Sequence, residues 1–164
     1  HNWLNIPPMD LLAYWDWGRI YDGEYTIVFA DIVTTKKMEQ AEIKPLAIFD
    51  SQKLVYLTTE SAKWSLNKSD LRPDPETGVK IPWNNTLRAR DDVLSLEVNL
   101  GLKQVFQRID LLADFNPLLR FLIRTFKAKP TITSFFSTGS GRLDLDGHSH
   151  ALECRALHEL VKNR

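Results

Sequence analysis

Apolar and polar residues alternate along much of this chain, as they do in β-strands that bury one face and expose the other. The alternation is clearest between residues 94 and 102, where aliphatic side chains occupy every second position. It also runs from position 24 to position 35, and this segment is rich in β-branched and aromatic residues. One face of that segment carries Tyr25, Ile27, Phe29, Asp31 and Val33. A period of two sustained over such stretches predicts long strands.

Turn sequences divide the chain into about nine predicted strands with short connections. The Asp22-Gly23 dipeptide predicts a hairpin between residues 12–21 and 24–35. The remaining predicted strands cover residues 45–49, 54–59, 63–71, 80–90, 93–102, 131–145 and 149–160. Residues 149–160 also fit a helical period, but the Asp146-Gly147 turn that precedes them favours a strand.

One amphipathic helix is predicted over residues 116–127. Asn116 is a favourable N-cap, and Pro117 occupies the first helical position, where its missing N–H costs nothing. The polar side of this helix is a basic stripe of Arg120, Arg124 and Lys127. We favour a helix packed over the sheet or the mouth of a barrel. The alternative is a helix that lies on an anionic membrane surface.

The strand pattern predicts a single all-β domain, either an up-and-down barrel or a strongly curled sheet. Small barrels either fill their interior with side chains or enclose one small ligand. The chain has 164 residues, with 21 basic and 21 acidic side chains, so no overall positive field favours binding to nucleic acid. Its single cysteine, Cys154, excludes an internal disulfide and a cluster of thiolate ligands.

Motifs for cofactors, metals and targeting give no positive signal. The sequence has no dinucleotide-binding, P-loop, nucleophile-elbow or zinc-protease motif, and no cofactor is predicted. His148 and His150 share one strand face without a third ligand nearby, so we expect no metal site and interpret them as solvent-facing turn residues. No signal peptide or spanning segment is visible, and the first residue is His rather than Met, so we expect the natural N-terminus to lie upstream.

Tryptophans and acids gather at the start of the chain and offer two interpretations. Trp15 and Trp17 share one strand face, where they either fill a core or line a cavity for an apolar ligand. If the face of Asp31 points into a barrel, burial would raise the pKa of this carboxyl, and it would keep its proton near neutral pH. The alternative, slightly favoured, is that Asp31 pairs with Arg19 or with a backbone amide.

Three stretches, HNW at 1–3, WDWGR at 15–19 and GEYTIVFADI at 23–32, resemble the AttH-like family, which contains the bacterial carotenoid hydratases (hydroxyneurosporene synthases). Members of that family resemble two lipocalin-like barrels in tandem. The resemblance implies that residues 1–164 form one lipocalin-like (calycin-type) antiparallel barrel, the C-terminal half of a two-barrel protein. An N-terminal barrel of the same protein is then an expected partner.

The resemblance also implies a reactive site. It maps this site onto His1 and Asp31, the candidate catalytic residues, and onto Trp3 and Phe29. The aromatic strand faces add Trp15, Trp17 and Tyr25, and with Trp3 and Phe29 these are the expected ligand-binding residues. Phe29 stands where the family leads us to expect a tyrosine. The implied reaction is addition of water to an alkene: a neutral Asp31 donates the proton, aromatic faces stabilise the carbocation, and water held by His1 captures it.

Three functions follow from these expectations. The favoured one is binding of a lipophilic small molecule, such as an isoprenoid or polyene, in an aromatic-lined barrel. The first alternative is a hydratase (a hydro-lyase) or cyclase domain that acts on such a molecule by acid catalysis. The second alternative is a filled, structural barrel in which Tyr25, Ile27 and Phe29 pack against residues 94–98 without a void.

Overall fold

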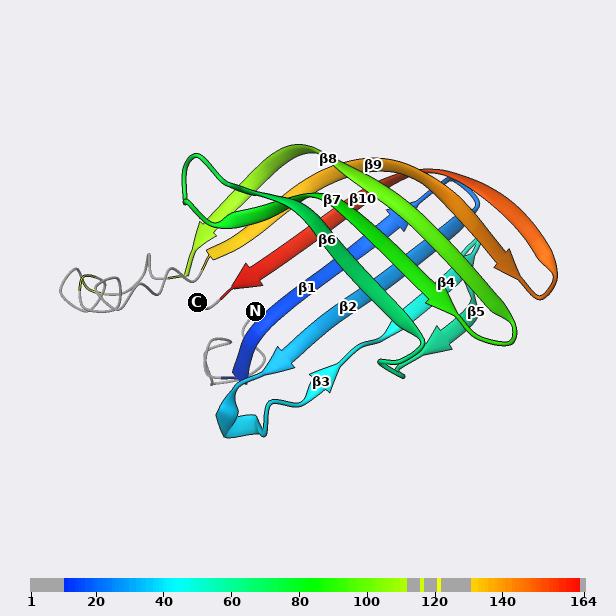
Figure 1. The fold of residues 1–164 in the computed structure, drawn as a ribbon, viewed down its shortest axis with the longest axis horizontal. Coiled ribbons are helices and arrows are strands. Elements are labelled where there is room, and N and C mark those ends of the chain that lie inside the picture. The colour runs from blue at the N-terminus through cyan, green and yellow to red at the C-terminus, as the bar shows by residue number, and fades with distance from the viewer. Residues whose placement is uncertain (1–10, 112–115, 117–120, 122–130, 163–164) are drawn as a thin grey trace.

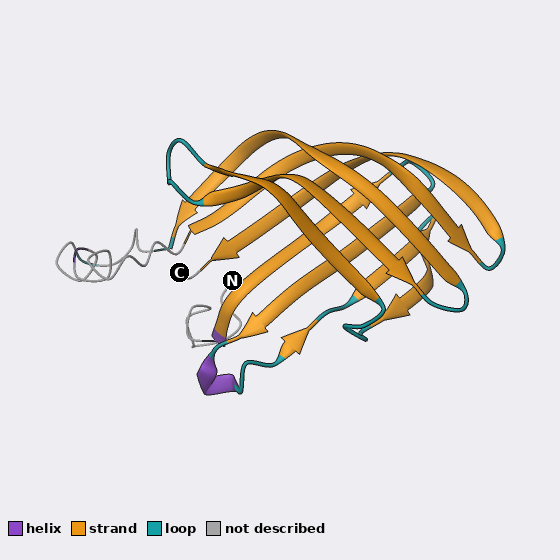
Figure 2. Ribbon diagram, viewed as in Figure 1, coloured by secondary structure: helices purple, strands orange, loops and turns teal. Residues whose placement is uncertain are grey.

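A computed structural model describes residues 11–111, 116, 121 and 131–162, and these form one curled antiparallel sheet (Figures 1 and 2). The strands are β1 (Leu12–Tyr21), β2 (Tyr25–Thr34), β3 (Glu42–Ile43), β4 (Leu46–Asp50), β5 (Lys53–Thr58), β6 (Trp64–Pro73), β7 (Lys80–Arg90), β8 (Leu94–Asp110), β9 (Thr131–Leu145) and β10 (His148–Lys162). Their order is β5-β4-β2-β1-β10-β9-β8-β7-β6, and β3 pairs with β2 at the side. The all-β antiparallel architecture predicted from the alternation is therefore confirmed, as a half-barrel.

The predicted hairpins form where the turn residues placed them. Asp22 explains the first, because its Oδ1 accepts hydrogen bonds from the backbone N–H groups of Glu24 (3.1 Å) and Tyr25 (2.7 Å). The segment after Asp146-Gly147 is a strand, β10, which pairs with β9 along its whole length. Strand β3 was not predicted, because its two residues are both exposed and show no apolar alternation.

Strand β8 is longer than predicted. The alternation ends at Leu102, but the strand continues to Asp110. Its register with β9 shifts between Leu102 and Gln104 and again between Val105 and Gln107. Each shift inserts a residue out of phase and breaks the period of two, so the second half of β8 does not look like a strand in the sequence.

The helix predicted over 116–127 lies outside the described residues, apart from Asn116 and Phe121. The described residues give this helix no support, and the helical element that they contain is a short 3₁₀ turn, η1 (Lys36–Met38). No helix in the described part of the chain is long and apolar enough to cross a membrane.

The inner face of the sheet, which we define as the face that forms the buried core, divides into two ends. We call one the filled end, because aliphatic side chains such as Ile27, Ile48, Leu87, Leu96 and Val98 pack there with at most 2% exposure. A smaller cluster of Ile81, Leu102, Phe135 and Leu160 lies toward the other end, where β1 begins and β10 ends (left in Figure 1). We call that other end the polar end, for the residues described below.

No described strand pairing joins the two edge strands, β5 and β6, but β6 is held across the interior by side chains. The Trp64 indole of β6 donates a hydrogen bond to the backbone oxygen of Lys44 (2.8 Å) and packs against Phe29 of β2, with ring centroids 6.0 Å apart. The half-barrel therefore closes by packing rather than by a backbone ladder, and its interior is enclosed between β6 and the strands β1 and β2.

Candidate functional site

Two carboxylates face each other at the polar end. The ladder between β1 and β2 places Asp16 directly opposite Asp31, and alternation along each strand turns both toward the inner face. Asp16 is fully buried, while Asp31 is partly buried. Opposed residues on neighbouring antiparallel strands have Cβ atoms about 4.5–5.5 Å apart, so these two acids form one site.

A lysine from the far edge of the sheet neutralises one of the two acids. The Nζ atom of Lys68, on β6, lies 2.7 Å from Oδ2 of Asp16. The same ammonium group contacts the hydroxyl of Tyr14 and lies 4.7 Å from the centre of its ring. Lys68 is 20% exposed and Asp16 is 1% exposed, so this ion pair spans the interior largely away from water. Ion pairs of this kind lose more solvation than exposed pairs, and breaking one is strongly destabilising.

Asp31 has no such partner among the described residues. Burial raises the pKa of its carboxyl, Lys44 counteracts this effect, and Glu42 adds to it. Arg19, the partner considered from the sequence, lies on the opposite face of β1, where its guanidinium is 4.5 Å from the Tyr21 ring. Of the two carboxyls, Asp31 is therefore the one whose neutral form is favoured by burial.

A buried imidazole lies one row deeper on the inner face. His158 is fully buried; its ring stacks on Phe135 (centroids 4.9 Å apart, planes at 8°) and meets the edge of Phe29 at 5.5 Å. Gly18 makes this arrangement possible, because a Cβ atom there would lie 2.4 Å from Cζ of Phe29. Burial, with a smaller effect of Lys68, lowers the pKa of His158 to about 3. The imidazole is therefore neutral at physiological pH.

Several other polar groups on the inner face are buried. Within the described residues, the hydroxyls of Thr133 and Ser137, the side-chain amide of Asn85 and both ring nitrogens of His158 have no hydrogen-bond partner. Sequence analysis missed these residues. They stand at alternating positions of β7, β9 and β10, but a single polar residue in a strand does not reveal which face it occupies. The polar end comprises Tyr14, Asp16, Asp31, Lys68, Thr133, Ser137 and His158.

The structure separates the residues that the sequence grouped together. Phe29, Asp31 and Tyr25 share the inner face of β2, and the Tyr25 ring lies 5.0 Å from that of His150. Trp15 and Trp17 lie on the outer face, where both indole N–H groups donate to Oε1 of Glu159, at 3.2 and 3.1 Å. With Leu12, Ala30, Ile32 and Glu159 they line an outer groove of about 340 Å³. The positions of His1 and Trp3 fall outside the described residues.

His150 and Cys154 each lie in surroundings that explain them structurally. His150 contacts Asp22, with 2.7 Å between Nε2 and Oδ2, instead of facing solvent alone. Burial raises the pKa of the Cys154 thiol to about 11, so it is protonated and unreactive. Among the described residues no group of three or more His, Cys, Asp or Glu side chains could hold a metal ion.

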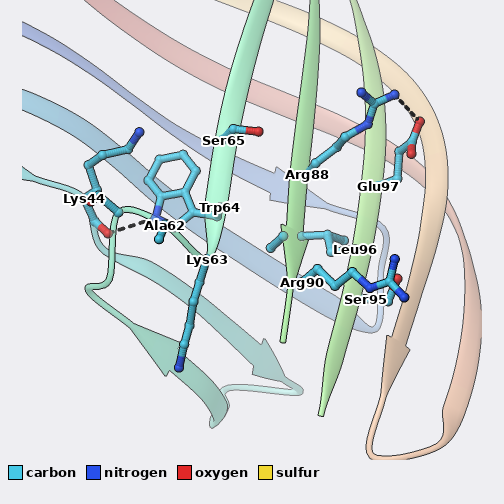
Figure 3. A pocket seen from close by; sticks show the side chains of 12 residues that line it. Lys44, Ala62, Lys63, Trp64, Ser65, Arg88, Arg90, Ser95, Leu96 and Glu97 are labelled. Atoms are coloured by element: carbon cyan, nitrogen blue, oxygen red, sulfur yellow. Dashed lines mark hydrogen bonds and ion pairs between the residues drawn. The ribbon is translucent and has the colours of Figure 1, made fainter. Parts of the chain in front are cut away.

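A second groove, of about 500 Å³, lies near the start of β6 (Figure 3). Basic side chains of Lys44, Lys63, Arg88 and Arg90 line it. Lys44 lies 4.9 Å from the Trp64 ring, and Arg88 pairs with Glu97 at 3.0 Å. This groove is open to solvent and shares no residue with the polar end.

No protein-family model and no curated protein sequence matches this chain. Solved structures do match its fold. Kievitone hydratase from Nectria haematococca has a TM-score of 0.62 and 15% sequence identity, and the match covers 92% of this chain and 40% of that one. CghA, also determined with Sch210972, has a TM-score of 0.57 and 11% identity, with 93% and 41% covered. An AttH-like protein from Nitrosomonas europaea has a TM-score of 0.52 and 14% identity, with 93% and 40% covered.

These neighbours confirm, at the level of the fold, the resemblance to the AttH-like proteins that the opening residues indicated. At 11–15% identity the likeness concerns the fold alone. The chain spans about 40% of the length of these neighbours. Its sheet therefore has the lipocalin-like fold found in about 40% of each of these longer proteins.

Proposed function

We propose that this chain is a lipocalin-like domain that binds a lipophilic small molecule, such as an isoprenoid or polyene, in the interior of its curled sheet. The proposal rests on the charged inner face of the polar end, where Asp16, Asp31 and Lys68 lie beside the rings of Tyr14 and Phe135. Moving a charge out of water costs several kcal/mol per ion. A purely structural barrel would be more stable with aliphatic residues here, so the charges favour a role in holding a ligand.

The fold neighbours support the same assignment. One is named a hydratase, and another has been determined together with Sch210972. Both names agree with the handling of a small molecule by proteins of this fold. Because the chain spans about 40% of those proteins, we further propose that a second barrel of the same protein is its partner.

The experiment that tests binding is a titration of the chain with retinol, followed by quenching of tryptophan fluorescence. Trp64 lies in the interior and reports on this site. We expect saturable quenching, with an affinity that falls about tenfold in Phe135→Ala, because aromatic rings supply much of the contact energy in apolar sites. The matched control is Trp15→Phe/Trp17→Phe, which alters rings of the outer face and is expected to leave the affinity unchanged.

Two results would overturn the proposal. Absence of saturable quenching by retinol and by a short carotenoid would mean that the interior is filled and structural. Loss of affinity in Trp15→Phe/Trp17→Phe, with Phe135→Ala unaffected, would place the ligand in the outer groove instead. Far-UV circular dichroism of each variant separates lost affinity from lost fold.

A second candidate function is acid-catalysed hydration of an alkene, and the raised pKa of Asp31 favours it. A protonated Asp31 would transfer its proton to one alkene carbon and leave a cation on the other. The rings of the polar end would stabilise that cation, and water would add to it and return a proton to Asp31. The roles of His1 and Trp3 in this reaction are predictions from the sequence.

Hydration is tested by incubating the chain with farnesene in ¹⁸O-labelled water and analysing the products by mass spectrometry. We expect one labelled hydroxyl per product, loss of product in Asp31→Asn, and partial recovery in Asp31→Glu. Product formation at an unchanged rate in Asp31→Asn would exclude Asp31 as the acid. Absence of labelled product with the wild-type chain would exclude hydration of this alkene and leave binding as the proposed function.

A further inference from the structure

The inner face of β9 and β10 carries three fully buried polar side chains around one aromatic ring. His158 stands directly opposite Phe135 in the ladder between the two strands, and its imidazole stacks on that ring. Thr133 and Ser137 lie two residues to either side of Phe135, so alternation turns them toward the same face. Exposure is 0% for Thr133, Ser137 and His158. Their polar atoms have no hydrogen-bond partner within the described residues.

This arrangement destabilises the folded protein unless another group forms the missing hydrogen bonds. A buried donor or acceptor that lacks a partner costs about 1–3 kcal/mol, and at least about 90% of buried polar groups in folded proteins are paired. The described neighbours of His158 do not supply the missing bonds. Phe29 and Phe135 present rings, Gly18 has no side chain, and the ammonium group of Lys68 is already engaged by Asp16 and Tyr14.

The donors and acceptors of the three side chains define which ligand group could form hydrogen bonds with them. A neutral imidazole has one N–H donor and one nitrogen acceptor, and each hydroxyl can both donate and accept. The matching ligand group therefore donates and accepts at the same point, as an alcohol does. A carboxylate or phosphate fits poorly, since Asp16 and Asp31 lie at the same end and the described cation there, Lys68, is already paired. A hydrocarbon would leave all three groups unpaired.

We propose that the lipophilic ligand of this barrel carries a hydroxyl group, and that His158, flanked by Thr133 and Ser137, binds this group. The inference rests on the proposed binding function and narrows its ligand from any apolar molecule to an alcohol with an apolar body. Among the described polar groups of this end, Lys68 is partly exposed, at 20%, and marks the side from which we expect the ligand to enter.

The test uses two probes that differ only in this group: retinol and its deoxy analogue, in which CH₃ replaces CH₂OH. Each is titrated into the wild-type chain and into His158→Phe, which keeps an aromatic ring stacked on Phe135. We expect the wild type to bind retinol at least tenfold more tightly than the deoxy analogue, and His158→Phe to bind the two within about twofold of each other. His148→Phe, a change at an exposed histidine, is the matched control and is expected to keep the preference.

Each outcome has a defined meaning. Equal affinity of the wild type for the two probes would overturn the hydroxyl inference while leaving lipophilic binding intact. A preference that persists in His158→Phe would place the hydroxyl elsewhere and also overturn it. Failure of both probes to bind would overturn the proposed function and this inference together.

If His158→Phe does not fold, the wild-type chain still decides the question. The ¹⁵N resonances of the His158 ring are expected to shift on addition of retinol and to stay in place on addition of the deoxy analogue. Equal shifts with the two probes, or no shift with saturating retinol, would contradict the proposal. Ser137→Ala gives an independent check, with an expected partial loss of the preference for retinol.

Discussion

The two ends of the half-barrel interior are built from neighbouring parts of one sheet, but they differ in what they bury. At the filled end, Ile27, Ile48, Leu87, Leu96 and Val98 are at most 2% exposed and belong to one continuous core cluster. Each fully buried aliphatic side chain contributes about 1.5–3 kcal/mol through removal of apolar surface from water. The filled end therefore accounts for much of the free energy that keeps the sheet curled.

The polar end buries polar and charged side chains, whose burial does not stabilise the fold in the same way. Asp16 and Lys68 lose solvation to form their pair, and Thr133, Ser137 and His158 are buried with no described partner. Natural proteins accept such costs mainly at functional sites. The filled end therefore stabilises the fold, while the polar end is the part of the interior to which the proposed function assigns the ligand.

The largest expected effect comes from a truncation at the filled end. Leu87→Ala removes a side chain with 0% exposure from the larger core cluster, and we expect the free energy of unfolding to fall by about 2–5 kcal/mol. The matched change at the polar end is Thr133→Val, which replaces an unpartnered hydroxyl by a methyl group. We expect this variant to be as stable as the wild type or more stable.

Urea unfolding, followed by circular dichroism, measures both changes. The two ends would not differ as described if Thr133→Val lost as much stability as Leu87→Ala. That result would mean that the Thr133 hydroxyl is hydrogen-bonded in solution, for example to an ordered water molecule.

The sequence predicted the strands far better than it predicted the faces. Alternation and turn residues located β1, β2 and β10, because both signals are local. The same alternation puts Trp15 and Trp17 on one face and Asp16 on the other, and ordinary hydrophobicity would bury the tryptophans. The structure does the reverse, because Glu159 on β10 binds both indoles from outside and Lys68 on β6 neutralises Asp16 from inside.

Those partners lie more than 50 residues away in sequence, so no local pattern reveals them. The sequence did predict that Asp31 and Phe29 share one face, since both positions follow from the alternation of a single strand. The burial of His158 could not be predicted, because nothing in the neighbouring sequence distinguishes a buried imidazole without partners from one that faces water. The second half of β8 was missed because its register shifts disrupt the alternation.

A smaller effect is expected from breaking the buried ion pair. Lys68→Met keeps most of the side-chain volume but leaves the Asp16 carboxylate buried without its cation, so we expect a loss of about 3 kcal/mol in the free energy of unfolding. Lys63→Met is the control, because Lys63 pairs with an exposed acid, Glu60, at 2.8 Å. We expect it to leave the urea midpoint nearly unchanged. Equal losses in the two variants would show that Lys68 contributes no more than a surface lysine does.

The smallest expected change in stability is found at two acids, Asp74 and Asp31. Their surroundings give opposite pH dependences of the free energy of unfolding. Asp74 accepts hydrogen bonds from Arg108 at 2.7 Å and from the hydroxyl of Thr77 at 2.7 Å, and these interactions, Arg108 first, lower its pKa from 3.8 to about 2. A carboxyl with a lowered pKa stabilises the folded protein above its unfolded-state pKa, and this stability is lost as the pH falls from about 3.8 through about 2. Asp74→Asn should therefore lose about 2 kcal/mol at pH 7 and little at pH 2.

Asp31 should show the reverse, because burial raises its pKa. Its ionised form destabilises the folded protein, and this cost appears as the pH rises above the unfolded-state value of 3.8. Asp31→Asn is therefore expected to be more stable than the wild type at pH 7 and equal to it at pH 3, as measured by urea unfolding at each pH. A loss of stability in Asp31→Asn at pH 7 would mean that this carboxylate has a stabilising partner in solution. Asp31 would then resemble Asp74, as a structural acid rather than a proton donor to the barrel interior.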